Sequence, residues 1–282
     1  MAHAAAPSTK PRPRVFRALG RSEPPVFVVI DDNEYALVDC LKHDSWAATG
    51  IYQGPAGKVV CKFNRQQRIG PIPMTWLGRR LARREHGLLT LLAELKHVPR
   101  ACGAVAERLP SGEARVLPNA VAHPYVEGHP LGRGERVADD FFDKLRATIE
   151  GVHARGVAYV DLHKRENIIV ADDGSPCLID FQVCFWPRGW WSRVWPVPAL
   201  LRTFQRMDDY HLMKHVIRCR PDLLKPEERD IDRYRPRSIR VWRRIGDPLR
   251  ATRRRILVLT GVRKKGGRAE TEVAPEEAYR SE

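Results

Sequence analysis

The sequence lacks long apolar runs, paired cysteines and internal repeats. No stretch approaches the roughly 18 apolar residues of a spanning helix, and the start MAHAAAPSTKPRPR has no apolar core of an export signal. The six cysteines form no CxxC pair, and several lie inside apolar, strand-like runs, as buried free thiols do. We therefore expect a cytoplasmic protein that is neither exported nor integral to a membrane.

The sequence also has few acidic residues: it contains 34 Asp+Glu and 49 Lys+Arg, so the formal net charge is +15. This excess implies an anionic partner such as nucleic acid, an acidic membrane surface or a phosphorylated substrate, and charge alone does not choose among them. The 282 residues and 43% hydrophobic content suit a globular chain of one large domain or two lobes. Residues 1–22 and 261–282 lack periodicity and predict disordered tails, the first of them basic.

The first half of the chain alternates short strands with one strong helix. Runs rich in β-branched and aromatic residues predict strands at 26–30, 35–42, 49–53 and 58–65, with GPAG at 54–57 as a hairpin turn. The segment TWLGRRLARREHGLLTLLAEL, residues 75–95, places leucines at helical spacing on one face: Leu77, Leu81, Leu88, Leu92 and Leu95. These patterns predict a small antiparallel sheet and a helix that packs on it.

Glu85 interrupts the leucine face of that helix. A carboxylate on a core-facing position needs a cationic or hydrogen-bonding partner, although a glutamate at the edge of the face could also extend to solvent. Lys62, in the middle of the strand around VVCK, is a candidate partner, and the alternative is that it lies on a solvated face of the sheet.

The segment VDLHKRENIIVADDGSPCLIDFQ concentrates polar side chains around two short apolar strands. DDGS predicts a hairpin with a two-residue loop, and that register places Asn167 directly opposite Asp180 at the open end. Their side-chain oxygens could then bind one hard cation, and Asp161 could reach the same end. The alternative is an ordinary hairpin with polar ends.

Together these residues resemble the protein-kinase-like phosphotransferases over about residues 35–185. That superfamily combines a Gly-rich loop, a strand lysine, a helix glutamate, H-R-D-x-x-x-x-N and D-F-G, and this chain has VVCK, Glu85, YVDLHKREN and IDFQ. The resemblance implies that Lys62 holds the phosphates of ATP and is itself held by Glu85. It further implies that Asn167 and Asp180 bind Mg²⁺, and that Asp161 orients or deprotonates the acceptor hydroxyl.

The resemblance also implies an α+β, two-lobed protein-kinase-like fold. A small antiparallel-sheet N-lobe would occupy residues 23–124, and an abbreviated, mainly helical C-lobe would occupy residues 125–260. Two further nucleotide-binding segments follow from it. KHDSWAAT would be the phosphate loop, and HPYVEGHPL would be the hinge that meets the adenine. Their expected binding residues are Ser45, Ala47, Ala48, Tyr125, Val126 and Glu127.

The chain departs from the kinase pattern in several places. The phosphate loop has no glycine, although His43 could add a donor, and Asp161 and Asn167 are six residues apart rather than five. Tyr159-Val160 replaces H-R, which removes the usual receptor for an activation-loop phosphate, and D-F-G has become Asp180-Phe181-Gln182. A catalytically inactive, pseudokinase scaffold is therefore an alternative to an active kinase.

The compact lobe, DLHKRENIIV and DFQ look most like the bacterial lipopolysaccharide core kinase family, with the RIO and aminoglycoside-type kinases as cousins. That resemblance implies an ATP- and Mg²⁺-dependent kinase that acts on a sugar hydroxyl of a lipid-linked glycan, as a monomer, at the inner face of the cytoplasmic membrane. The first alternative keeps the fold and replaces the acceptor with a protein or a small molecule.

Three later segments bear on partners. Four tryptophans interleaved with Arg188 and Arg193 suit a membrane surface, or else pack against the lobe: Trp186, Trp190, Trp191 and Trp195. Four polar residues of the helix that follows form its polar face or line the acceptor site: Asp208, Asp209, His211 and Lys214. The basic tract 233–255 suits anionic lipid or phosphorylated glycan, and with few aromatic residues and no RNA motif it does not favour nucleic acid.

Overall fold

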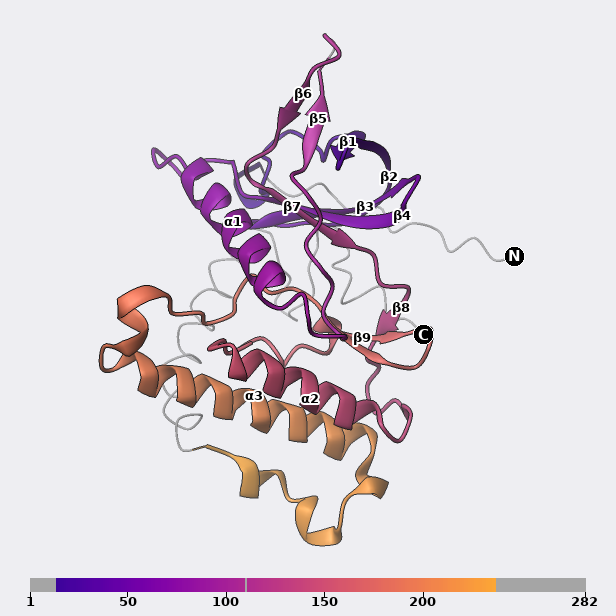
Figure 1. The fold of residues 1–282 in the computed structure, drawn as a ribbon, viewed down its shortest axis with the longest axis vertical. Helices are drawn as coiled ribbons and strands as arrows, with labels where there is room; N and C mark the ends of the chain where they lie inside the picture. Colours follow the sequence, from indigo (N-terminus) through magenta and orange to yellow (C-terminus); the bar gives the residue numbers. More distant parts are fainter. Residues whose placement is uncertain (1–13, 110, 237–282) are drawn as a thin grey trace. The chain divides into compact units, whose positions relative to one another are not determined.

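The computed structural model describes residues 14–109 and 111–236 (Figure 1). The described chain is α+β and divides into two compact units. The first contains residues 14–83 and 102–123, and the second contains residues 84–101 and 124–236. The expected C-lobe limit at 260, the tail 261–282 and most of the basic tract lie outside the described residues.

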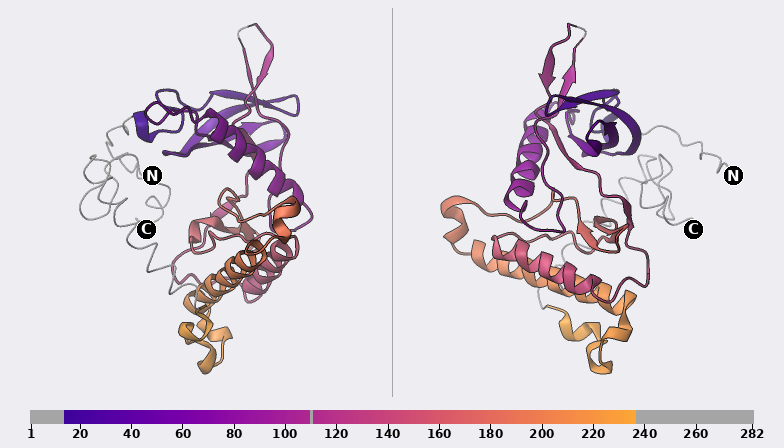
Figure 2. Two further views of the ribbon diagram at one scale, coloured as in Figure 1. Left: turned by 90° about the vertical axis from the view of Figure 1, so that its left-hand side faces the viewer. Right: turned by 45° about the vertical axis from the view of Figure 1, so that its right-hand side comes forward.

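A seven-stranded sheet forms most of the first unit, in the order β6-β5-β1-β2-β3-β4-β7. The neighbours β1–β2, β2–β3, β3–β4, β1–β5 and β5–β6 are antiparallel, and the hairpin of β5 and β6 extends away from the rest of the sheet (Figures 1 and 2). The four predicted strands and the turn at residues 54–57 are confirmed. The strands are β1 Phe27–Ile30, β2 Asn33–His43, β3 Ala47–Gly54, β4 Gly57–Asn64, β5 Ala106–Arg108, β6 Ala114–Val116 and β7 Ala120–Pro124.

The core of this unit follows from alternation along the strands. On β4 the side chains of Val59, Cys61 and Phe63 are buried in one cluster, and the intervening Val60 and Lys62 point to the other face. Each buried side chain of this size contributes about 1.5–3 kcal/mol. Lys62 is half-buried and pairs in register with Thr49 of β3.

The segment of residues 14–22 is ordered, so the expected tail 1–22 is too long. Ala18 is fully buried, its N–H donates to the carbonyl of Asp44 at 2.7 Å, and its carbonyl accepts from the N–H of Gln66 at 2.9 Å. The guanidinium of buried Arg65 donates to the carbonyl of Val15 at 3.0 Å. These long-range backbone contacts hold a segment that has no periodicity of its own, and residues 1–13 lie outside the described residues.

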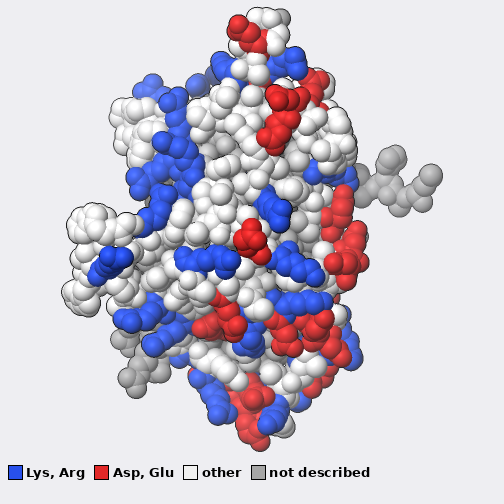
Figure 3. Space-filling model, viewed as in Figure 1, with Lys and Arg blue, Asp and Glu red and all other residues white. Residues whose placement is uncertain are grey.

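Helix α1, Thr75–Leu91, confirms the predicted helix, which ends four residues earlier than expected. Its residues 75–83 count with the first unit and 84–91 with the second. Glu85 is only 4% exposed, so the alternative in which it extends to solvent is wrong. The buried face also contains Ala82, Leu88 and Leu89. Basic side chains gather along α1 on the face seen in Figure 3, whereas acidic and basic side chains are mixed over α2 and α3.

The second unit contains two long helices that lie side by side, α2 Phe141–Ala154 and α3 Val197–Cys219 (Figures 1 and 2). A three-stranded sheet accompanies them in the order β10-β9-β8, and α2 contacts β10. Its strands are β8 Gly128–Pro130, β9 Ile168–Ala171 and β10 Pro176–Leu178. Short 3-10 helices are η1 Arg14–Phe16, η2 Arg165–Asn167, η3 Gly189–Arg193, η4 Pro221–Leu223, η5 Pro226–Glu228 and η6 Ile231–Tyr234. Within the described segments, no helix has both the length and the apolar character required to cross a membrane.

Candidate functional site

The Asp161 loop, residues 159–167, is held by a fully buried carboxylate. Asp208 of α3 accepts hydrogen bonds from the N–H of Tyr159 at 2.7 Å and of Val160 at 2.8 Å, and from His153 Nε2 at 3.1 Å. Val160 has φ +69°, a left-handed conformation that is costly for a β-branched residue. The bonds to Asp208 offset that cost and fix the backbone immediately before Asp161.

Asp161 is buried and surrounded by polar partners. Its carboxylate lies 2.8 Å from Lys164 Nζ and 3.4 Å from His163 Nδ1. Asn167 Nδ2 donates to Oδ2 of Asp161 at 3.3 Å. The structure therefore brings Asp161 and Asn167 together despite their six-residue spacing, because a turn at Asp161–Lys164 and the 3-10 helix η2 take up the extra residue.

The register of the β9–β10 hairpin differs from the prediction by one residue. Ile168 pairs with Leu178 and Val170 with Pro176, and the N–H of Ile179, not that of Asp180, donates to the carbonyl of Asn167 at 3.0 Å. Asn167 and Asp180 are therefore not directly opposite, and that prediction is wrong.

The cause of the shift is a three-residue loop, 172–174, in place of two. Gly174 adopts φ +75° as the last loop residue, and its N–H donates to the carbonyl of Ala171 at 2.7 Å. The Asp173 carboxylate accepts from the hydroxyl of Ser175 and from its N–H at 2.9 Å, and these two bonds lower the pKa of Asp173. A left-handed glycine in the third loop position is typical of three-residue hairpins.

Asp180 is half-buried and has φ +59°, which interrupts the strand alternation one residue after Ile179. The Tyr159 hydroxyl donates to the carbonyl of Ile179, and the Tyr159 and Phe181 rings meet edge to face at 5.3 Å between centroids. Burial raises the pKa of Tyr159 well above its usual value, so this hydroxyl stays protonated. Tyr159 thus connects the Asp161 loop to the residues on both sides of Asp180.

Oxygen ligands of the type that Mg²⁺ prefers are present in this unit. Asn167 Nδ2 faces Asp161, which leaves the amide oxygen as the atom that a cation would bind. In the chain that the structure describes, no group of three or more His, Cys, Asp and Glu side chains is arranged to hold a metal. The residue types fit a magnesium site with few protein ligands, and the assignment of Asn167 and Asp180 stays a prediction.

The four polar residues predicted on α3 separate into different environments. Asp208 is fully buried, Asp209 is exposed, and His211 and Lys214 are half-buried. The His211 ring lies 5.6 Å from the ring of His163, which itself contacts Asp161. The polar-face interpretation is wrong for Asp208, and the acceptor-site interpretation stays open for His211. The clue to Asp208 in the sequence is its helical spacing, four residues before Leu212 and eleven before Cys219, which puts it on the same face of α3 as these buried residues.

In the predicted phosphate loop, the carboxylate of Asp44 occupies the backbone N–H groups that a phosphate would bind. Asp44 Oδ1 accepts from the N–H of Trp46 at 2.7 Å and of Ala47 at 3.0 Å, and Oδ2 lies 2.8 Å from Lys42 Nζ. Burial raises the pKa of Asp44, but Lys42 and the two amides outweigh burial, so the pKa is lowered overall and the group is ionised at neutral pH. Ala48 is fully buried beside this loop.

Two further predicted donors of that loop are also engaged. Ser45 Oγ donates to the carbonyl of Phe16 at 3.3 Å. His43 is buried, with Nδ1 2.8 Å from Arg17 and 3.3 Å from Glu23. A phosphate at this loop would therefore have to displace the Asp44 carboxylate from the loop amides.

The predicted hinge, Tyr125 to Glu127, connects β7 to β8. Tyr125 and Val126 are half-buried, and the carbonyl of Glu127 accepts from the N–H of Asp172 at 3.2 Å. At Gly128, with φ +144°, a Cβ would lie 2.2 Å from the carbonyl oxygen of Val170, so only glycine fits there. Lys62 and Glu85 belong to different units, and their pairing stays a prediction.

Comparison of the chain with protein-family models and with curated proteins finds no match in either set. Function is therefore argued from the residues of the candidate site.

Proposed function

We propose that the protein is an ATP- and Mg²⁺-dependent kinase of the protein-kinase-like type, with a two-lobed kinase fold, that phosphorylates a hydroxyl group. The observation that carries this proposal is the buried Asp161–Asn167 pair, with Lys164 at 2.8 Å from Asp161, on a loop whose strained backbone is held by Asp208. Strain that is maintained by a dedicated buried carboxylate is typical of functional loops.

In the proposed reaction Asp161 orients the acceptor hydroxyl and accepts its proton. The acceptor oxygen forms a bond to the γ-phosphorus of ATP, the bond to the bridging oxygen breaks, and ADP leaves. Asn167 and Asp180 would bind Mg²⁺, which supplies charge neutralisation at the phosphates. Lys164 beside Asp161 would stabilise developing negative charge, and Lys62, positioned by Glu85, would hold the phosphates together with the loop at Ser45, Ala47 and Ala48. Tyr125, Val126 and Glu127 would meet the adenine.

The test is Asp180→Ala, with Asp172→Ala as the matched control because Asp172 is exposed in the turn of the same hairpin. Loss of a metal ligand should reduce Mg-ATP-dependent phosphorylation by at least about 100-fold and leave the unfolding midpoint close to that of the wild type. The control should retain activity. Full activity of Asp180→Ala would refute the kinase proposal.

A lipid-linked sugar, as in lipopolysaccharide core, is the proposed acceptor, and exposed aromatic residues support a membrane-bound one. Trp190, Trp191 and Trp195 are 65%, 57% and 83% exposed, and the first two stack at 4.0 Å between centroids. Arg188 lies 4.4 Å over the ring of half-buried Trp186. The alternative prediction, that the tryptophans pack against the lobe, is therefore wrong for these three. Exposed tryptophans next to arginines suit an anionic membrane surface at the cytoplasmic side.

Sedimentation with anionic vesicles tests the membrane contact. The double variant Trp190→Ala/Trp191→Ala should lose binding, whereas Trp76→Ala, an equally exposed tryptophan on α1, should keep it. Binding that is absent in the wild type, or the same in both variants, would remove this support. Radiolabelled ATP offered to lipid, glycan and protein fractions then identifies the acceptor class, and label confined to protein would reject the glycan.

An inactive scaffold is the second candidate, and the Asp44 carboxylate on the loop amides favours it. Thermal unfolding with ATP, with and without Mg²⁺, discriminates between the two. An active kinase should gain stability with Mg-ATP. The scaffold is favoured if neither ATP nor Mg-ATP raises the unfolding temperature of the wild type. The Asp44→Ala variant, which frees the loop amides, should then also show no rise.

A further inference from the structure

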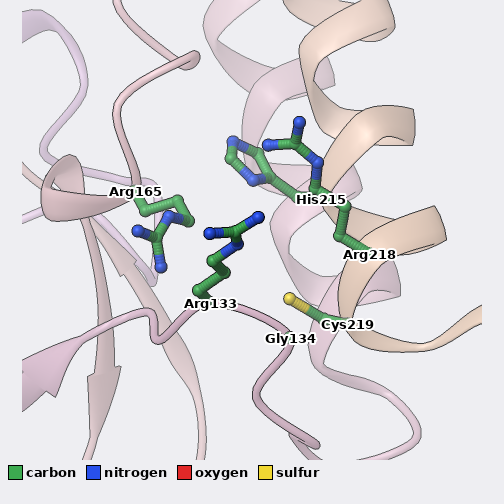
Figure 4. A pocket seen from close by; sticks show the side chains of 6 residues that line it. All are labelled: Arg133, Gly134, Arg165, His215, Arg218 and Cys219. Atoms are coloured by element: carbon green, nitrogen blue, oxygen red, sulfur yellow. The ribbon is translucent and has the colours of Figure 1, made fainter. Parts of the chain in front are cut away.

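A pocket in the second unit is lined by three arginines, and none of its lining residues is assigned to nucleotide or metal (Figure 4). Its volume is about 230 Å³, and three segments contribute to it. The segment after β8 gives Arg133 and Gly134, η2 gives Arg165, and the end of α3 gives the rest. We call this cavity the arginine pocket. It is lined by Arg133, Gly134, Arg165, His215, Arg218 and Cys219.

The positive charge of the three arginines is not neutralised by any other residue that lines the pocket. Arg133, Arg165 and Arg218 all line the pocket, and none of the six lining residues is acidic. The nearby Glu135 is engaged elsewhere, because its carboxylate contacts His129 Nε2 at 2.8 Å and the N–H of Gly132 at 2.6 Å. Like charges in one pocket wall repel each other, so an anion in the pocket would be stabilised by the arginines that line it.

One of the arginines is already oriented. Arg165 NH1 donates to the carbonyl of Leu131 at 3.3 Å, which fixes its guanidinium in the pocket wall and leaves its other N–H groups available. A side chain that is ordered before binding loses less conformational entropy when a ligand arrives. Arg133 and Arg218 are exposed at the mouth, and neither forms an ion pair or a side-chain hydrogen bond with another described residue.

His215 forms the buried part of the wall and joins the pocket to the Asp161 loop. Its Nε2 donates to the carbonyl of Leu162 at 2.8 Å, one residue after Asp161. The buried Nδ1 has no hydrogen-bond partner among the described residues, and a buried polar atom of this kind calls for water or a ligand nearby. Arg165 belongs to the same loop, so the pocket and Asp161 share one backbone segment.

The volume limits what the pocket holds. A water molecule occupies about 30 Å³ of liquid, so about 230 Å³ accommodates a phosphate group with a short substituent. Pockets for drug-sized ligands run from about 300 to 1,000 Å³, so a whole nucleotide is too large. Arginine matches phosphate oxygens with paired N–H donors, which favours phosphate over a spherical anion.

We propose that the arginine pocket is a binding site for the phosphate group of a phosphate monoester. The site is independent of the proposed kinase reaction, because its binding requires neither ATP nor Mg²⁺ and uses none of the residues assigned to them. The monoester is either a small soluble molecule or a lipid headgroup, and both present the same dianionic phosphate.

The test is calorimetric titration of the full chain with glycerol 3-phosphate, without ATP and Mg²⁺. Arg133→Ala and Arg218→Ala should each weaken binding about tenfold, as expected for loss of one charged hydrogen-bonding partner. Arg206→Ala is the matched control, since Arg206 is an exposed arginine of α3 outside the pocket, and it should bind like the wild type. The His215 ring resonances should shift on titration, with a midpoint at about tenfold higher ligand concentration in Arg218→Ala than in the wild type.

Vesicles of phosphatidylcholine with and without phosphatidic acid form the second arm. Binding to either the soluble monoester or the phosphatidic acid vesicles, with loss in Arg218→Glu but not in Arg206→Glu, supports the site and identifies its source. No saturable binding to either probe would overturn the proposal. Equal weakening by the pocket and control variants would also overturn it, because the chain's +15 charge would then explain the binding.

Discussion

Asp208 illustrates how one buried side chain determines the conformation of a functional loop. Its carboxylate is 0% exposed and accepts from two consecutive backbone N–H groups and from His153. The next residue on α3, Asp209, is exposed. Two adjacent aspartates look equivalent in the sequence, and only the helix rotation and the position of the Asp161 loop distinguish them.

Asp208→Asn should therefore destabilise the protein, because the amide group replaces one acceptor oxygen with a donor that faces an N–H. We expect a loss of about 3 kcal/mol in the free energy of unfolding, measured by urea denaturation. Asp209→Asn is the control and should change stability by less than about 0.5 kcal/mol. Equal losses in the two variants would contradict the role given to Asp208.

Tyr159→Phe tests whether the Tyr159 hydroxyl positions Asp180. The variant loses the bond to the carbonyl of Ile179, and Tyr52→Phe loses a similar buried bond, 2.8 Å to the carbonyl of Pro25, in the first unit. Each should cost about 1 kcal/mol of stability. Only Tyr159→Phe should lower the Mg-ATP-dependent turnover, by roughly tenfold, since small displacements of reacting groups are costly. Unchanged turnover with the same stability loss would assign Tyr159 a structural role alone.

At the scale of elements, periodicity predicted the strands β1 to β4, the helix α1 and the position of Glu85 on its buried face. The hairpin register was not predictable by the same means. DDGS is compatible with two-residue and three-residue loops, and the choice depends on which residue takes the left-handed conformation. The structure gives that role to Gly174, and the register moves by one.

Gly174→Ala and Gly87→Ala should have opposite effects on stability. A Cβ at Gly174 meets no atom within 4 Å, so its cost is the backbone strain of φ +75°, about 1 kcal/mol. Gly87 lies inside α1, and its Cβ would make ordinary contact with Trp186 at 3.6 Å. Alanine there should stabilise by up to about 1 kcal/mol. Thermal unfolding of both variants checks the signs, and two losses would be inconsistent with the described turn and helix.

At the scale of the whole molecule, the α+β class that the kinase resemblance implied is confirmed, whereas the limits of the units were not predicted. Residues 84–101 belong with the second unit, because Arg84 donates to the carbonyl of Cys184 and the N–H of Leu178 donates to the carbonyl of His97 at 2.9 Å. These partners are far apart in the chain, so local patterns carry no sign of them. The same holds for the ordered segment at residues 14–22, which is fixed by long-range backbone bonds.

His215 should make a large contribution to the pH dependence of the protein's free energy of unfolding. Burial lowers the pKa of His215 from 6.5 to about 4, and Arg218, Lys214 and Arg165 act in the same direction against the bond to Leu162. The unfolded chain therefore binds a proton between pH 6.5 and 4 that the folded chain excludes, so stability falls as the pH falls through this window.

At pH 5 the expected loss is about 2 kcal/mol relative to pH 7, from 1.36 kcal/mol per pKa unit. His215→Gln keeps a donor for the carbonyl of Leu162 and cannot titrate, so the free energy of unfolding of this variant should fall less between pH 7 and 5. Urea denaturation of both proteins at the two pH values measures the difference. The same decrease in the free energy of unfolding in both proteins would show that His215 does not titrate in this window. A phosphate monoester bound in the arginine pocket should raise the His215 pKa and so reduce the decrease in the wild type.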